Sequence, residues 1–103
     1  MKILDKYIEF EWDKGNIDKN KTKHDIENKE AEEIFLCKQK FIFKDKLHSQ
    51  KEERLRIFGK TNKNRKLLVV FTIRNKRIRI ISARDMNKKE VKFYEKKINT
   101  TKI

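Results

Sequence analysis

The chain has 103 residues and a formal net charge of +13, from 29 lysines and arginines against 16 aspartates and glutamates. A polyanion is therefore the expected partner, nucleic acid ahead of anionic lipid, although a genome rich in A and T produces the same lysine bias without selection for binding. This length suits one domain over residues 1–103. A single cysteine excludes an intramolecular disulfide. Because the chain has only two histidines besides it, we predict no metal or cofactor site.

The N-terminal segment, MKILDKYIEFEW, carries acidic residues where a signal peptide would continue its apolar run. Because no later apolar run is long enough to span a membrane, we expect a cytoplasmic protein. Residues 7–12 alternate as a short strand, whose apolar side carries Phe10 and Trp12. We expect both ends of the chain to fray, before residue 7 and after residue 98.

Helical patterns follow this strand. Asp13 can cap a helix on which Ile17 and His24 share one face. A second helix is predicted over residues 28–36. Its buried stripe consists of Ala31, Ile34 and Phe35. The run KFIFK then predicts a short strand or an apolar loop, and the polar residues 45–51 predict a mobile loop.

From Arg54 onward the chain has the pattern of a β-meander. RLRIFG alternates, and LLVVFTI, residues 67–73, is apolar on both sides, as suits a central strand. RNK makes a tight connection in which Asn75 tolerates a positive φ, and RIRIISAR returns antiparallel. Asn87 and Glu90 then resemble a capping box for a final helix. Its apolar side carries Val91, Tyr94 and Ile98.

These elements add up to an α+β fold, an antiparallel β-sheet with helices packed on one face and a C-terminal helix. Two strands each carry an arginine pair on the side opposite their apolar residues, Arg54 with Arg56 and Arg77 with Arg79. Guanidinium groups bind phosphate bidentately and stack on bases, so this face suits single-stranded RNA. Ion pairs with neighbours such as Glu53 are the simpler alternative, but such surface pairs stabilise a fold by only about 0–1 kcal/mol.

The sequence also resembles a known family. The motifs that carry the resemblance are, in chain order, FEWD, NKTKHDI, EER, LLVV and RIRIISAR, with Glu90 and Tyr94 beyond them. In order and spacing they are similar to the BrnT family of bacterial type II toxins. The resemblance implies a small ribonuclease with a RelE-like fold, which cleaves RNA and arrests translation. It also implies a cognate antitoxin with a ribbon-helix-helix DNA-binding domain, in a hetero-oligomeric complex that binds operator DNA.

RNA cleavage without a metal ion uses the adjacent 2′-OH as the nucleophile. It needs a proton acceptor, a proton donor, and cations that stabilise the added charge on phosphorus. Because the sequence has no acidic cluster for divalent ions, this route is favoured over a two-metal mechanism. The predicted catalytic cations are Arg54, Arg79 and Arg84. Strict alternation along the strand, however, predicts that Arg84 lies on the face opposite Arg79.

Glu53 and Tyr94 are the predicted catalytic partners of these cations. Glu53 either accepts a proton or holds Arg54 in place, and Tyr94 packs its ring while its hydroxyl reaches a partner. His48 titrates near neutrality, yet a loop histidine exposed to solvent is the simpler interpretation. The predicted RNA-binding residues are Arg56, Arg77, Lys23 and His48.

Two departures from the family pattern bear on activity. Asp25 stands where members carry the glycine of KHG, and Ile73 stands where many carry the acid of TER. If that acid moved a proton or oriented Arg74, the chain would be a weakened toxin. A degenerate toxin that binds its antitoxin without cleaving RNA is therefore one alternative. A non-catalytic module that binds nucleic acid is another.

Overall fold

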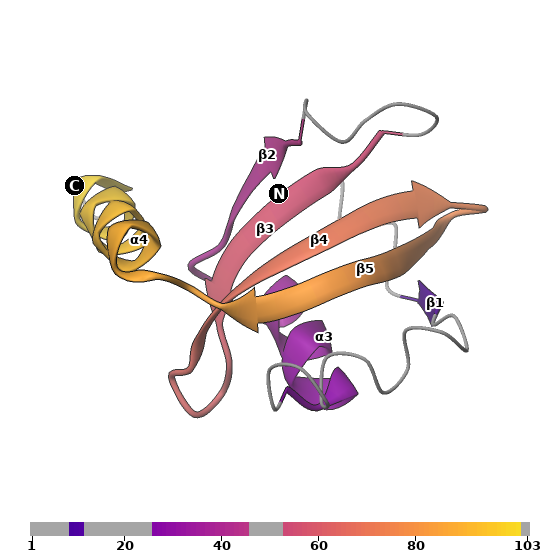
Figure 1. The fold of residues 1–103 in the computed structure, drawn as a ribbon, viewed down its shortest axis with the longest axis horizontal. Coiled ribbons are helices and arrows are strands. Elements are labelled where there is room, and N and C mark those ends of the chain that lie inside the picture. Colours follow the sequence, from indigo (N-terminus) through magenta and orange to yellow (C-terminus); the bar gives the residue numbers. More distant parts are fainter. Residues whose placement is uncertain (1–8, 12–25, 46–52, 102–103) are drawn as a thin grey trace.

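The computed structural model describes residues 9–11, 26–45 and 53–101. Its elements in chain order are β1 (Phe10–Glu11), α3 (Asn28–Leu36), β2 (Phe41–Lys44), β3 (Leu55–Lys60), β4 (Lys66–Arg74), β5 (Arg77–Asp85) and α4 (Lys88–Thr101). The strands form a five-stranded sheet in the order β1-β5-β4-β3-β2 (Figure 1). Among the described residues, no helix combines the length and the apolar character needed to cross a bilayer.

Several predicted elements inside these ranges are confirmed. Residues 28–36 form α3, the KFIFK run contains strand β2, and residues 67–73 lie in the central strand β4. Other predictions fall outside the described residues, namely those for Trp12, the helix capped by Asp13, Lys23, His24, Asp25, His48 and the loop after Asp45.

The α+β class is confirmed, and the sheet is mixed. Neighbouring strands from β2 to β5 pair antiparallel. In the predicted meander this follows because short connections join β3 to β4 and β4 to β5. Strand β1 instead pairs in parallel with β5, and Glu11 lies opposite Arg79. The Ile78 N–H donates to the Glu9 carbonyl at 2.9 Å. The prediction of an antiparallel sheet therefore holds for the meander, to which β1 adds a parallel edge.

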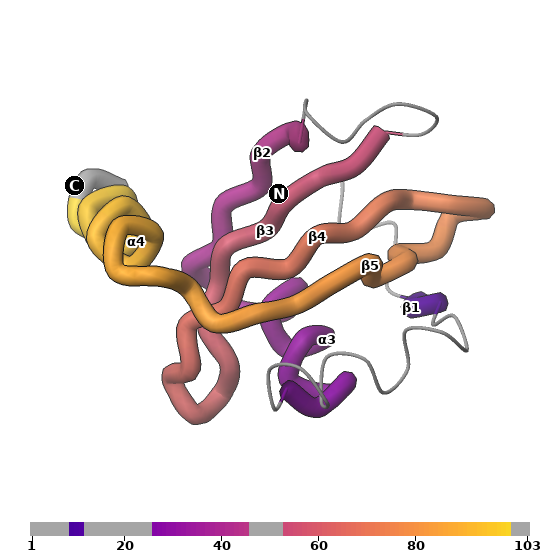
Figure 2. Tube along the Cα trace, viewed as in Figure 1, coloured from indigo at the N-terminus to yellow at the C-terminus, as the bar shows by residue number. Residues whose placement is uncertain are grey.

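The connection between β4 and β5 is a two-residue turn, which Figure 2 traces at the end of these strands. Asn75 has φ 52° and Lys76 has φ 63°, and the flanking residues Arg74 and Arg77 pair with each other. Positive φ at both turn residues matches the right-handed twist of the two strands. The predicted positive φ at Asn75 is confirmed.

Helix α3 packs on one face of the sheet, which we call the α3 face. The helix begins with a capping box between Glu27 and Glu30, and its predicted apolar stripe is buried. The Phe35 ring meets the Phe71 ring edge-on, with centroids 4.9 Å apart. The main core therefore lies between α3 and the side chains that β3, β4 and β5 direct toward it.

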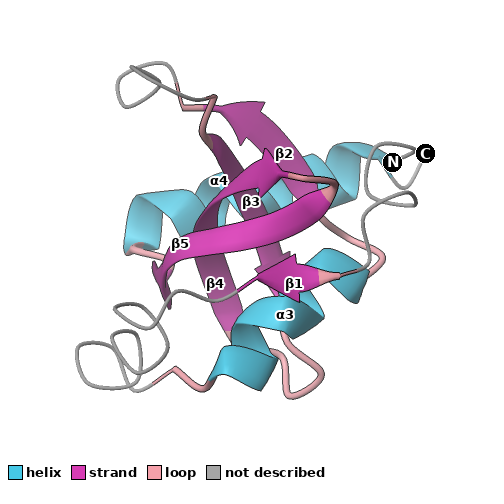
Figure 3. Ribbon diagram, turned by 90° about the vertical axis from the view of Figure 1, so that its right-hand side faces the viewer, coloured by secondary structure: helices cyan, strands magenta, loops and turns pink. Residues whose placement is uncertain are grey.

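Helix α4 packs on the opposite face of the sheet. Its buried Tyr94 belongs to a second apolar cluster with Phe58, Leu68 and Met86. Phe58 and Leu68 alternate away from α3 along β3 and β4, so in Figure 3 the strands lie between the two helices. The prediction of helices on one face thus holds for α3, whereas α4 crosses to the other face because its apolar side meets this second cluster.

A bulge in β5 decides which of its side chains share that opposite face. The register of β4 with β5 shifts between Val70 and Phe71, which leaves Ile81 as an extra residue in β5. The extra residue reverses the alternation of everything that follows it. Arg84 therefore shares its face with Arg79, and the separation predicted from strict alternation does not occur.

Gly59 lies where β3 passes closest to α3. A Cβ atom there would lie 2.7 Å from Ile34 Cγ2 and 2.9 Å from Cys37 Sγ. We expect Gly59→Ala to lower the free energy of unfolding by about 1–3 kcal/mol, because the added methyl group forces α3 away from the sheet. Urea unfolding followed by circular dichroism measures this. The cost should shrink in an Ile34→Ala background, and an equal cost in both backgrounds would show that the clash with Ile34 is not its cause.

Candidate functional site

The sheet face opposite α3 gathers arginines from two strands that flank the central one. We call it the arginine face and define it by Arg54, Arg56, Arg79 and Arg84. Strand β3 and the residue before it supply Arg54 and Arg56, and β5 supplies Arg79 and Arg84. The fold therefore brings the three predicted catalytic arginines together with the predicted RNA-binding Arg56.

The strand register sets the spacing of these side chains. Arg56 lies opposite Val70 on β4, and Arg79 lies opposite Thr72 two residues farther along β4. One strand thus separates the arginines of β3 from those of β5, which corresponds to roughly 10 Å between the backbones. Arginine side chains are long enough to converge on a single anion across this gap.

Arg84 is held by a bidentate ion pair with Glu90 of α4. Its Nη1 donates to Glu90 Oε1 at 2.7 Å and its Nη2 donates to Glu90 Oε2 at 2.9 Å. Hydrogen bonding from Arg84 holds the pKa of Glu90 below its usual value, and burial opposes this only partly. The same hydrogen bonds raise the pKa of Arg84. Both groups are therefore charged at neutral pH.

Glu90 lies in the first turn of α4, so the ion pair is tied to a helix end. The Asn87 N–H donates to Glu90 Oε1 at 2.9 Å, and the Glu90 N–H donates to Asn87 Oδ1 at 2.9 Å. This reciprocal pair is the predicted capping box. The helix cap thus fixes the carboxylate that in turn fixes Arg84.

The ion pair leaves part of the Arg84 guanidinium for another ligand. Within the described part of the chain, its acceptors are the Glu90 carboxylate and the Asp85 carbonyl, which lies 3.2 Å from Nη1. Neither acceptor bonds the Nε–H. This hydrogen and the remaining hydrogen on Nη2 point the same way, and together they can donate to two oxygens of one anion. An arginine has five N–H donors, so Arg84 can hold Glu90 and a phosphate at the same time.

Arg56 occupies the middle of the arginine face. It lies between Phe43 on β2 and Val70 on β4. Its Nε is buried and has no hydrogen-bond partner among the described residues. A buried donor without a partner costs free energy, which an incoming anion can recover.

Arg79 and Arg77 differ in their surroundings although both lie on β5. Arg79 is half-buried between Thr72 and Glu11, its register partners on β4 and β1. Arg77 lies at the turn, is exposed, and donates from Nε to Glu9 Oε2 at 3.0 Å. The structure therefore favours Arg79 for the centre of the site and Arg77 for its margin.

The predicted acid–base candidates occupy different environments. Glu53 is exposed beside Arg54, and its carboxylate lies 3.8 Å from Lys44 Nζ. Tyr94 is fully buried, its hydroxyl donates to the Gln39 carbonyl, and desolvation raises the pKa of Tyr94 to about 12. This geometry favours the supporting role of Tyr94 over proton transfer. The remaining predicted contacts, Lys23 and His48, lie outside the described residues.

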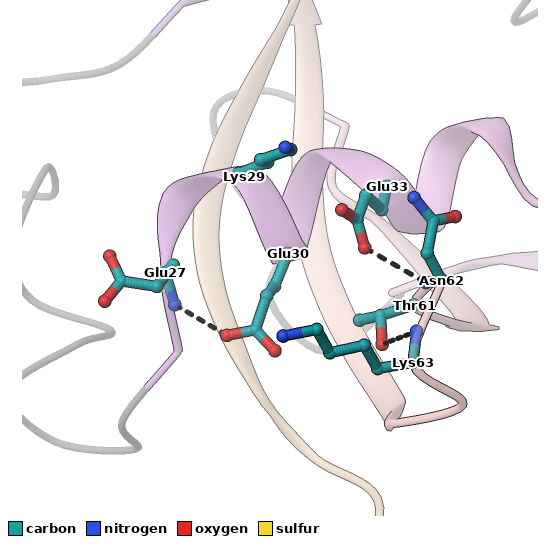
Figure 4. Close-up of a pocket in the computed structure, with 7 residues that line it drawn as sticks. All are labelled: Glu27, Lys29, Glu30, Glu33, Thr61, Asn62 and Lys63. Carbon is teal, nitrogen blue, oxygen red and sulfur yellow. Dashed lines mark hydrogen bonds between the residues drawn. The ribbon is translucent and has the colours of Figure 1, made fainter.

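A pocket of about 560 Å³ lies away from the arginine face, between α3 and the connection of β3 to β4 (Figure 4). Its lining consists of Glu27, Lys29, Glu30, Glu33, Thr61, Asn62 and Lys63. The Glu33 carboxylate accepts the Asn62 N–H at 3.0 Å, and Glu30 pairs with Arg65 at 3.4 Å. These carboxylates disfavour phosphate, so the pocket is no candidate for an RNA site. Among the described residues, His, Cys, Asp and Glu form no group of three that could hold a metal ion.

The family model described as "Ribonuclease toxin, BrnT, of type II toxin-antitoxin system" matches residues 12–90. The chain belongs to the BrnT family. A comparison with curated proteins finds no match. The matched range contains the whole arginine face and ends at Glu90, so the family pattern covers the ion pair that holds Arg84.

Membership in the BrnT family makes the chain a ribonuclease toxin of a type II system, with a cognate antitoxin as its partner. The resemblance drawn from the sequence motifs is confirmed at this level. Among the described residues, the arginine face joins several guanidinium groups on one sheet surface, an arrangement that suits phosphate groups.

Sequence reasoning missed the site role of two acids that border this face. It identifies Glu90 as a helix cap and as part of the family pattern, and Glu11 only as part of the FEWD motif, and it assigns neither to the site. Glu11 could have been found from the alternation of side chains in FEWD, because alternation places Glu11 on the side of the strand opposite Phe10. No local signal could find the contact between Glu90 and Arg84, because it depends on where α4 crosses the sheet.

Proposed function

We propose that this BrnT-family chain is an endoribonuclease that cleaves RNA without a metal ion and thereby inhibits translation. The observation that carries the proposal is the shared face of Arg54, Arg56, Arg79 and Arg84. Guanidinium forks match pairs of phosphate oxygens. Several of them on one face can stabilise the added negative charge of a pentacoordinate phosphorus.

In the proposed reaction, the 2′-OH beside the scissile phosphate loses its proton and its oxygen attacks phosphorus. The bond from phosphorus to the 5′ oxygen breaks, and that oxygen takes up a proton. The products are a cyclic phosphate and a free 5′-hydroxyl. Arg79 and Arg84 contact the reacting phosphate, Arg54 and Arg56 extend the cationic surface, and Arg77 contacts a neighbouring phosphate.

Glu53 is the proposed proton acceptor. Its carboxylate is exposed next to Arg54, so a substrate hydroxyl can reach it, and its contact with Lys44 is long. Tyr94 supports the site by packing α4 against the sheet. Lys23 and His48 stay predicted RNA contacts from the sequence.

The proposed antitoxin carries a ribbon-helix-helix domain and neutralises the toxin by covering the arginine face. An acidic or amphipathic segment suits this face, because the chain carries a net charge of +13. The resulting hetero-oligomer is proposed to bind operator DNA through the antitoxin.

The test is cleavage of a defined single-stranded RNA by the purified chain in EDTA, followed by analysis of the new ends. We expect fragments with 5′-hydroxyl ends, and we expect the cognate antitoxin to stop their formation. Salt-sensitive RNA binding without cleavage would indicate the non-catalytic module. Antitoxin binding without RNA cleavage would indicate the degenerate toxin that Ile73 suggests.

A further inference from the structure

Helix α4 borders the arginine face with side chains that follow one side of the helix. One turn after Glu90, Phe93 packs its ring against Phe43 and Phe58, with centroids 5.6 Å and 5.7 Å away. One turn farther, the Lys97 ammonium lies 5.3 Å from the centroid of the Phe43 ring. Phe93, Phe43 and Phe58 thus form an aromatic patch, which lies beside Glu90 along α4 and has the Lys97 ammonium next to it.

Phe93 is held in place and yet remains open to solvent. Its ring is inclined by 53° to Phe43 and by 60° to Phe58, so two neighbouring rings support it. The residue is nevertheless 42% exposed, whereas Phe58 is 5% exposed. The Lys97 ammonium lies 5.9 Å from the centroid of the Phe93 ring, so a flat ligand would stack on the part of the ring that this ammonium leaves open. A ring that is already supported loses little further freedom when such a ligand binds.

The aromatic patch adjoins the proposed phosphate site. Phe43 lies directly opposite Arg56 on the neighbouring strand, and opposed side chains have their Cβ atoms about 5 Å apart. Arg56 therefore places positive charge beside Phe43, and Lys97 places it 5.3 Å from the Phe43 ring and 5.9 Å from the Phe93 ring. Such a mixture complements a nucleotide, which carries an anionic phosphate beside a flat base.

We propose that Phe93, supported by Phe43, forms a stacking site for an unpaired nucleobase of the RNA that occupies the arginine face. This inference rests on the proposed function, because its ligand is part of the same substrate. Every base has a π-face, so stacking selects single-stranded RNA without selecting a sequence. A paired base cannot leave its stack without cost, so duplex RNA would lose this contact.

The test compares two uncleavable 2′-O-methyl oligonucleotides of equal length, one with bases and one abasic throughout. We expect Phe93→Ala to weaken binding of the oligonucleotide with bases by about tenfold and to leave the abasic one unchanged. Phe93→Tyr keeps a π-face and should restore wild-type affinity. Leu36→Ala removes an exposed apolar side chain from α3 and should change neither affinity. Circular dichroism checks that each variant folds.

Equal affinities of Phe93→Ala and wild type for the oligonucleotide with bases would overturn the stacking site. Equal losses for both oligonucleotides would also overturn it, because the ring would then act only on the backbone or the fold. If Phe93→Ala binds RNA normally but escapes the antitoxin, Phe93 belongs to a protein interface and the proposal fails. A wild-type chain that neither binds nor cleaves RNA would instead refute the proposed function itself.

Discussion

Replacing Arg79 with alanine is expected to abolish growth arrest and to lower the rate of RNA cleavage by about 100- to 1,000-fold. Arg79 is half-buried on the arginine face, with Thr72 opposite it on β4 and Glu11 opposite it on β1. Its removal takes away a cation from the proposed phosphate site and no part of the core. Cleavage by the purified variant and growth at equal expression measure the effect.

Arg77→Ala is the matched control, because it removes a guanidinium from the same strand and the same face. Arg77 is exposed at the turn and already pairs with Glu9, so we expect its loss to reduce cleavage only slightly and chiefly at low salt, where exposed charges are least screened. Arg79→Lys should retain little activity, since a lysine ammonium cannot form the bidentate contact. Full toxicity of Arg79→Ala would remove this residue from the proposed site.

Replacing Glu90 with glutamine is expected to slow RNA cleavage by up to about 100-fold with little loss of stability. The carboxamide keeps one oxygen for the Asn87 N–H, but it turns an NH₂ group toward Arg84 and breaks the bidentate pair. Arg84 then loses the orientation that the proposed contact with the phosphate requires, and a misplacement of about 1 Å can slow a reaction by that factor. Single-turnover cleavage with saturating enzyme measures the change.

Asn87→Ala separates positioning from helix capping. This variant removes the side chain that caps the Glu90 N–H and should lower the free energy of unfolding by about 1 kcal/mol, while the bond between Arg84 and Glu90 remains. We therefore expect Asn87→Ala to be less stable yet to cleave at nearly the wild-type rate. If both variants cleave RNA as the wild type does, Glu90 acts only as a helix cap.

Much of the fold follows from local patterns in the chain. Alternation predicted the meander, the apolar run of residues 67–73 predicted its central strand, and Asn75 predicted the tight turn. The buried stripe of α3 followed from helical spacing. These features depend on neighbours in sequence, because side chains in strands repeat every two residues and those in helices every three or four.

The candidate site depended on contacts between residues far apart in the chain or on local irregularities. The bulge at Ile81 is invisible to a pattern of strict alternation, yet it moves Arg84 to the face of Arg79. The parallel pairing of β1 brings Glu11 beside Arg79, 68 residues farther along the chain. Neither arrangement has a signature in the residues that immediately surround it.

The sequence by itself determined that the chain is a basic α+β protein of the BrnT family with an arginine pair on each of two strands. Tertiary structure alone decided that α4 crosses to the face opposite α3, so that Glu90 holds Arg84 and Phe93 packs on Phe43, the register partner of Arg56. The physical reason is that local patterns fix which side of an element is apolar. Which surfaces then meet is fixed by the packing of the whole chain, here by the second cluster of Phe58, Leu68 and Tyr94 against the sheet.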